Sequence, residues 1–251
     1  ENEKLFKELT YADSSIKKAL ICGQTSEGNL LLASGKYCYI IKDDKSVTIL
    51  EKLSKLVETR SSPVDVRQLK NDEWLFCLPQ NIVLANIKQQ KIIKSFSYTD
   101  PTGVCKINDT SFITGSYSKD TIAIVNTNTG KITPINNWKS NTGMPMGGYM
   151  SGITAIGNSR YAVGSRYFGL YIIDVKDSSY EHVVSNPAIA SSLRSNFLQS
   201  LFYTSDGTLF INAPGLSYTR VKPQPFKSLT VFTNEKGIVF KGSAMCFTED
   251  A

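Results

Sequence analysis

The chain has 251 residues, of which 41% are hydrophobic, and a net charge of +6 from 28 Lys and Arg against 22 Asp and Glu. This length suits one large all-β domain or two small ones, and no stretch approaches the roughly 20 apolar residues that span a bilayer. The basic residues are scattered instead of gathered on one face with aromatic residues between them, which argues against nucleic-acid binding. The charged beginning, ENEKLFKELT, lacks the apolar stretch of a signal peptide.

The cysteines are odd in number and contain no C-x-x-C pair. Each lies inside an apolar run, where a free thiol behaves as a small hydrophobic group. We therefore expect no disulfide framework, no metal site and no cofactor. The cysteines are Cys22, Cys38, Cys77, Cys105 and Cys246.

Six similar segments follow one another along the chain, and each begins with a short apolar strand that ends at a turn signal. The six first strands are KALICG (18–23), VDVRQL (64–69), TGVCKI (102–107), SGITAI (151–156), QSLFYT (199–204) and KSLTVF (227–232). The second strands are LLLAS (30–34), WLFCL (74–78), FITGS (112–116), YAVGS (161–165), LFINA (209–213) and VFKGS (239–243). A third strand follows in most segments, and SVTIL (46–50), KIIKSF (91–96), KITPI (131–135) and EHVV (181–184) supply a fourth.

The fourth position of the second strand is small in five of the six segments. Glycine weakens a strand and needs a packing reason, so this position predicts close approach of neighbouring sheets. The residues are Ala33, Cys77, Gly115, Gly164, Asn212 and Gly242.

Four-stranded antiparallel units of this length predict an all-β fold, a β-propeller of about six blades, with residues 1–251 as a single domain. The sixth segment lacks a fourth strand, which residues 4–10 could supply, closing the ring with the N-terminal strand. The alternative is that the chain is part of a longer sensor region. Apolar residues at helical spacing in residues 49–60 predict a short helix between the first two blades.

The segment SLRSNFLQSLFYTSDGTLFINAPGL (192–216) resembles the two-component regulator propeller family. Residues Leu193, Ser195, Asn196, Ser200 and Leu201 match the first part of the repeat pattern of that family, and Asp206, Gly207, Leu209, Ile211, Gly215 and Leu216 match the second part. The match is good over about 25 residues of the fifth segment and partial in the others, and the strand tryptophan of the family is replaced in every segment.

The resemblance implies an extracytoplasmic sensor region of a hybrid histidine kinase, in the periplasm or outside the cell. It further implies a small-molecule or oligosaccharide ligand, a homodimer formed through a longer sensor chain, and membrane attachment only through segments outside this chain. A cytoplasmic location is the alternative.

The sequence offers little for catalysis. The single histidine, His182, lies in an expected outer strand, far from the centre of the ring, so its replacement should leave activity intact. Most acidic residues occupy turns, which favour Asp for local hydrogen bonds. Asp65 is the only acid inside the six first strands, and a propeller glycosidase or lyase would need acids converging there.

Candidate binding residues gather on one face of the expected ring. The loops between second and third strands and the connections between blades meet there, and they carry aromatic residues beside Arg, Asn and Asp, a combination that suits sugars. The same residues would suit a peptide partner of a WD-type interaction propeller, although the Gly-His and Trp-Asp dipeptides of that class are absent. The candidates are Lys36, Tyr37, Tyr117, Lys119, Asp120, Trp138, Tyr149, Arg166, Tyr167, Phe168, Arg194 and Asn196.

Overall fold

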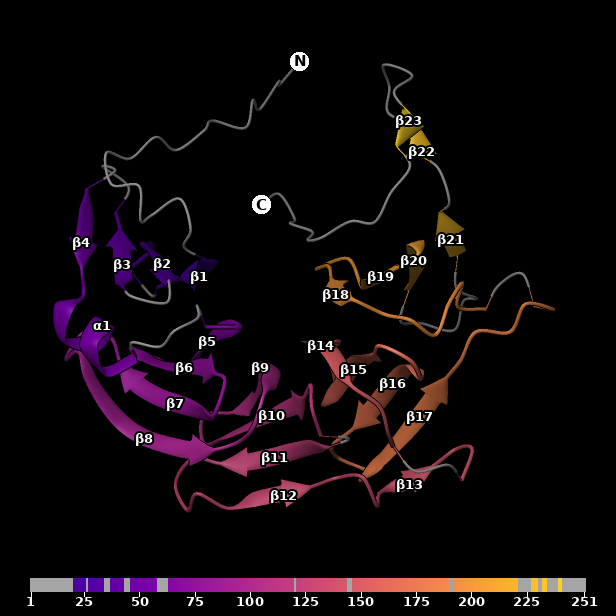
Figure 1. The fold of residues 1–251 in the computed structure, drawn as a ribbon, viewed down its shortest axis with the longest axis horizontal. Helices are drawn as coiled ribbons and strands as arrows, with labels where there is room; N and C mark the ends of the chain where they lie inside the picture. Colours follow the sequence, from indigo (N-terminus) through magenta and orange to yellow (C-terminus); the bar gives the residue numbers. More distant parts are fainter. Residues whose placement is uncertain are drawn as a thin grey trace.

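The fold is given by a computed structural model, which describes residues 20–25, 27–33, 37–42, 46–57, 63–119, 121–143, 146–189, 192–220, 227–229, 232–233 and 239–240. The described strands form five sheets of at least four strands, which follow one another in chain order around a common centre (Figure 1). The strand earliest in the chain lies nearest the centre in every sheet except the fourth, in which the earliest strand lies at the outer edge. The innermost strands of consecutive sheets contact each other. Each sheet is therefore one blade of a propeller.

Blade one contains β1 (Leu20–Gln24), β2 (Leu30–Ala33), β3 (Cys38–Ile41) and β4 (Val47–Ile49). Blade two contains β5 (Asp65–Lys70), β6 (Glu73–Leu78), β7 (Asn81–Asn86) and β8 (Lys91–Ser97). Blade three contains β9 (Pro101–Asn108), β10 (Ser111–Ser116), β11 (Ile122–Asn126) and β12 (Ile132–Pro134). Blade four contains β13 (Lys139–Ser140), β14 (Met150–Ala155), β15 (Arg160–Ser165), β16 (Gly169–Asp174) and β17 (Ser179–Val183). Blade five contains β18 (Ser200–Tyr203), β19 (Thr208–Ala213), β20 (Gly215–Arg220) and β21 (Lys227–Leu229).

The structure confirms the propeller and corrects three details of it. The described strands make five blades instead of about six, and the sixth repeat contributes only the pair β22 (Phe232–Thr233) and β23 (Val239–Phe240). Residues 227–232 do not form one strand, because β21 pairs with β20 and completes blade five. Blade four gains a fifth strand, since β13 pairs in parallel with the outer strand β17. The expected closing strand, residues 4–10, lies outside the described residues.

The hydrophobic core is divided into layers between blades. Four clusters of buried residues lie between blades one and two, two and three, three and four, and four and five. Strand β6 shows how one sequence serves two layers: Trp74 and Phe76 pack toward blade one, whereas Leu75 and Cys77 pack toward blade three. Alternate side chains point to opposite faces of a sheet, so strands buried on both faces are apolar at nearly every position.

Four of the small residues of the second strands, Ala33, Cys77, Gly115 and Gly164, face the next blade, as the sequence predicts. A Cβ atom placed on Gly115 would come 3.0 Å from Cβ of Met150 in blade four. A Cβ atom on Gly164 would come 3.0 Å from Oγ of Ser151 and 3.4 Å from Cβ of Leu198, which precedes blade five. The absence of a side chain at these two positions thus lets consecutive blades approach closely.

The expected helix is also present, as α1 (Glu51–Val57) between blades one and two. Leu53 of this helix is fully buried in the layer between them. Oγ of Ser54 donates to the Leu50 carbonyl and accepts a hydrogen bond from the Cys38 amide, which ties the helix to blade one. Within the described part of the chain, no helix is long and apolar enough to cross a membrane.

Candidate functional site

A pocket of about 320 Å³ opens where blades two, three and four meet, and we call it the mouth pocket. Its walls come from the beginnings of the inner strands and from the loops that follow the second strands, which all lie on one face of a propeller. The lining residues are Val64, Pro79, Asp100, Pro101, Thr102, Tyr117, Met150, Ser151 and Arg166.

Two of the loops around the mouth pocket are held by a serine that ends the preceding second strand, Ser116 in blade three and Ser165 in blade four. Oγ of Ser165 accepts hydrogen bonds from the amides of Tyr167 and Phe168, at 3.4 and 3.3 Å. Oγ of Ser116 accepts from the Lys119 amide at 3.1 Å and donates to the Thr99 carbonyl. Serine hydroxyls commonly form such local turns, and this repeated position fixes both loops on a rigid strand end.

Arg166 is the central side chain of the mouth pocket. Its amide donates to the Tyr149 carbonyl at 2.9 Å, and its Cζ atom lies 4.8 Å from the centre of the Tyr117 ring, a cation–π arrangement. Nε of Arg166 and Oγ of Ser151 are both buried without a hydrogen-bond partner. Buried polar groups are almost always paired, and an unpaired one costs about 1–3 kcal/mol. Neither atom has accessible surface, and Ser151 Oγ lies next to Gly164 on the side of Leu198, so these two donors do not themselves contact a ligand in the pocket.

A row of four aromatic rings leads away from Arg166 across the same face. The centre of Tyr117 lies 5.7 Å from that of Tyr149, Tyr149 lies 5.8 Å from Tyr167, and Tyr167 lies 6.0 Å from Phe197. The three tyrosines are 41–57% exposed, so their rings are available to a ligand. We call these four residues the aromatic row.

The structure therefore brings together four of the residues expected from the sequence: Tyr117, Tyr149, Arg166 and Tyr167. Sequence reasoning missed Phe197, which follows the connection 186–196 by one residue. It also missed Ser151 and Asp100. The sequence criterion of an aromatic residue in a connection between blades would have found Phe197 if the connection had been taken one residue further.

Other expected site residues take structural positions. Trp138 is half-buried in the layer between blades three and four, next to β13 at the outer edge and away from the mouth. Asn196 accepts a hydrogen bond from the Ser185 amide through its side-chain oxygen, which fixes the preceding connection. The Arg194 side chain packs over the turn at Gly215.

The remaining candidates lie at the edge of the site or outside the described residues. Tyr37 is exposed on blade one and packs 5.9 Å from Tyr39 instead of joining the aromatic row. Phe168 is exposed beside Gly148, and Lys119 is exposed in its loop. Lys36 and Asp120 are outside the described residues.

His182 contacts the backbone of the loop that carries Tyr167 and Phe168. Its ring stacks on Tyr171 with centres 4.6 Å apart, and its Nε2 donates to the Phe168 carbonyl at 2.6 Å. Because it reaches the loop backbone and does not line the mouth pocket, these contacts support a positioning role.

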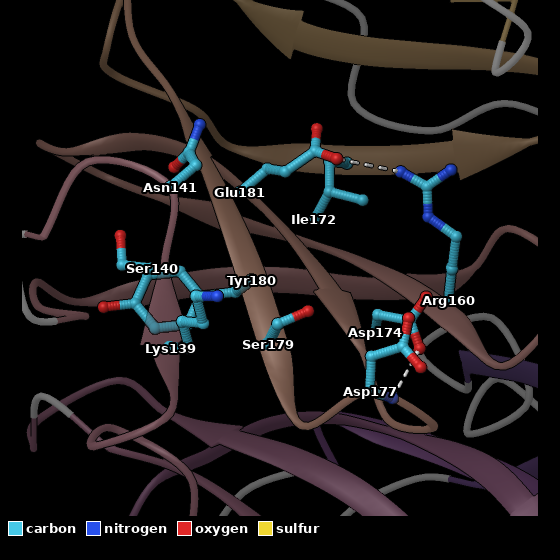
Figure 2. A pocket seen from close by; sticks show the side chains of 10 residues that line it. All are labelled: Lys139, Ser140, Asn141, Arg160, Ile172, Asp174, Asp177, Ser179, Tyr180 and Glu181. Carbon is cyan, nitrogen blue, oxygen red and sulfur yellow. Dashed lines mark hydrogen bonds and ion pairs between the residues drawn. The ribbon is translucent and has the colours of Figure 1, made fainter.

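A larger hollow of about 570 Å³ lies along the outer edge of blade four, between β13, β17 and the beginning of β15 (Figure 2). Three of its charged groups have partners within the chain: Arg160 lies 3.7 Å from Glu181, and the Asp174 carboxylate accepts the amides of Lys176 and Asp177. This outer groove thus lacks the unpaired buried donors that distinguish the mouth pocket. Among the described residues, no cluster of three or more His, Cys, Asp or Glu side chains could hold a metal ion.

Similar architectures occur among solved structures. The extracellular domain of the hybrid two component system BT4673 from B. thetaiotaomicron aligns with 92% of this chain at 17% identity and a TM-score of 0.66. A second structure of the BT4673 extracellular domain aligns with 90% at 16% identity and a TM-score of 0.65. The WD40 β-propeller domain of Doa1 aligns with 74% at 17% identity and a TM-score of 0.55. The fold is that of a β-propeller.

This propeller covers 30–31% of the BT4673 chains and 57% of the Doa1 chain. No family model matches the sequence, and no curated protein matches it.

Proposed function

We propose that this chain is a ligand-binding sensor propeller without catalytic activity. It serves as the extracytoplasmic input region of a two-component signalling system and binds a glycan or a related small molecule at the mouth pocket. The observation that carries the proposal is the mouth pocket itself, whose wall holds Arg166 in cation–π contact with Tyr117 beside the exposed rings of Tyr149 and Tyr167.

The surroundings of the pocket support a saccharide in particular. Exposed tyrosine rings offer apolar faces to the C–H groups of sugars, while Arg, Thr and Asp groups offer hydrogen bonds to hydroxyls. Ligand sites generally combine an apolar lining with a few placed polar groups. The likeness to an extracellular domain of a two component system supports the signalling context.

A protein-interaction propeller is the second candidate. Tyr and Arg dominate the energetics of protein interfaces as well, and the aromatic row extends beyond the mouth pocket. This candidate predicts that a peptide or protein, and no saccharide, binds the same face.

Calorimetric titration of the purified chain with a panel of neutral and acidic oligosaccharides tests the proposal. The double variant Arg166→Ala with Tyr167→Ala should abolish binding while the melting temperature stays within a few degrees. Arg160→Ala is the matched control, because Arg160 lies at the opposite end of β15 and lines the outer groove. A double variant that binds normally would move the ligand elsewhere, and one that unfolds would make these residues part of the packing between blades.

A further inference from the structure

The positively charged side chain in the wall of the mouth pocket, Arg166, indicates the chemical class of the ligand. Four ion pairs join side chains among the described residues: Asp65 with Arg67, Lys70 with Glu73, Lys106 with Asp109, and Arg160 with Glu181. Arg166 belongs to none of them, although its side chain is partly buried and its Nε is fully so. Within the part of the chain that the structure describes, this arginine has no carboxylate partner.

The contacts of Arg166 leave its edge for a planar acceptor. The Arg166 Cζ atom lies 4.8 Å from the centre of the Tyr117 ring, and this cation–π contact uses none of the N–H donors of the guanidinium in a hydrogen bond. A carboxylate matches that edge with two parallel hydrogen bonds and neutralises the charge.

The rest of the pocket supplies acceptors suited to hydroxyl groups. Asp100 and Thr102 line it. The Thr102 hydroxyl donates to the Gly115 carbonyl, so its oxygen lone pairs remain to accept. Among the described residues, no hydrogen bond or ion pair joins the Asp100 carboxylate to another side chain. A ligand that carries both a carboxylate and hydroxyls meets donors and acceptors alike here.

We infer that the mouth pocket anchors the carboxylate of an acidic saccharide, with a uronic acid residue seated against Arg166. The inference rests on the proposed function and names the chemical class of its ligand. The neighbouring sugars follow the aromatic row from Tyr117 past Tyr149 and Tyr167 toward Phe197, from blade three to the connection before blade five. The ligand is thus an oligosaccharide, since a monosaccharide would leave most of the row uncovered.

The test compares uronic-acid oligosaccharides with the same oligosaccharides after reduction of the carboxyl groups to alcohols. Hydrogen bonds to charged groups contribute enough that the acid forms should bind about tenfold to a hundredfold more tightly. This difference should shrink at high salt, which screens charges and leaves neutral contacts largely unchanged. Arg166→Gln should remove the preference for the acid form, whereas the control Arg160→Gln should retain it.

The outcomes separate the inference from the function on which it rests. Equal binding of acid and reduced forms, or an undiminished acid preference in Arg166→Gln, would overturn the carboxylate anchor while leaving a glycan sensor. Absence of binding to either form by the folded chain would overturn the proposed function. Tyr149→Ala should weaken a trisaccharide at least tenfold more than a single uronic acid, and equal losses would overturn the role of the aromatic row.

Discussion

The Asp65 carboxylate accepts a hydrogen bond from the Val104 amide at 3.1 Å, which joins the inner strand of blade two to the inner strand of blade three. The same carboxylate accepts from the Val66 amide and pairs with Arg67 at 3.0 Å. Asp65 also raises the pKa of the Arg67 guanidinium. The only acid found inside the first strands therefore has a structural role in the contact between two blades.

Asp65→Asn should destabilise the fold without affecting the mouth pocket. The amide keeps only one acceptor oxygen, so one backbone amide loses its partner and the ion pair with Arg67 is lost. Hydrogen bonds to charged groups are worth about 1.5–3 kcal/mol, and we expect a loss within that range, lowered by partial exposure to solvent. Urea denaturation measures it. Asp109→Asn, in an exposed pair with Lys106, is the control that should change little.

Gly115→Val should destabilise the contact between blades three and four. The added side chain meets Cβ and Cγ of Met150 at 3.0 and 3.1 Å, and overpacking of this kind typically costs about 1–3 kcal/mol. Gly164→Val should act similarly against blade five. Gly147→Val is the control, because a Cβ atom there meets nothing within 4 Å. An unchanged denaturation midpoint for Gly115→Val would contradict the close approach of the blades.

Alkaline pH should weaken the contact between blades three and four. Desolvation, with a smaller contribution from Asp65, raises the pKa of the Cys105 thiol to about 12, and its Sγ donates to the Ile153 carbonyl of blade four. A raised pKa in the folded state gives stability that is complete below the unfolded value of about 8.5 and is lost as pH rises toward 12. Cys105→Ala should reduce the fall in stability between pH 8 and pH 10.5. An identical fall in both proteins would show that other groups cause it.

His182→Ala should leave saccharide binding largely intact. The substitution removes the hydrogen bond from Nε2 to the Phe168 carbonyl, whose net value is about 1 kcal/mol, and does not alter the pocket wall. Affinity should fall by less than about tenfold, measured by the same titration. His182→Gln, whose amide can donate to the same oxygen, should recover part of any loss. Complete loss of binding by the folded His182→Ala protein would instead place this residue in the site.

Local sequence predicts much of this fold because each blade repeats one pattern. The second strands, the small residue that faces the next blade and the helix α1 all follow from periodicity and turn signals in short windows. The division of residues 227–232 between β21 and β22 did not follow, because KSLTVF contains no Gly, Pro, Asn or Asp to mark a turn and only its hydrogen-bond partners separate the two parts. The pairing of β13 with β17 likewise depends on a contact between segments 40 residues apart along the chain.

The sequence predicts on which face of the ring the candidate site lies, but it does not predict how the side chains of the site are placed relative to one another. Loop positions predict that Tyr117, Tyr149 and Tyr167 lie on one side of the ring, but their ring distances depend on the angle between blades. Trp138 and Asn196 met the same criteria as the other candidates, a suitable residue type in a connection between blades. Trp138 nevertheless packs in the core, and Asn196 fixes a loop. No pattern in the sequence predicts that Ser151 Oγ and Arg166 Nε are buried, because their burial depends on the packing of segments that are far apart along the chain.

Because each core layer is shared by only two consecutive blades, stability in this chain depends on nearest neighbours, as in other repeat proteins. Opening of blade three removes two of these layers, whereas opening of blade five removes one described layer. Blade one has a further buried cluster of its own, formed by Leu32, Tyr39 and Ile41. Blades two to four enclose the mouth pocket. If local unfolding begins at the first and last described blades, the mouth pocket is therefore the last part to lose its structure. Amide hydrogen exchange should then be slowest in β10, at the middle of the array.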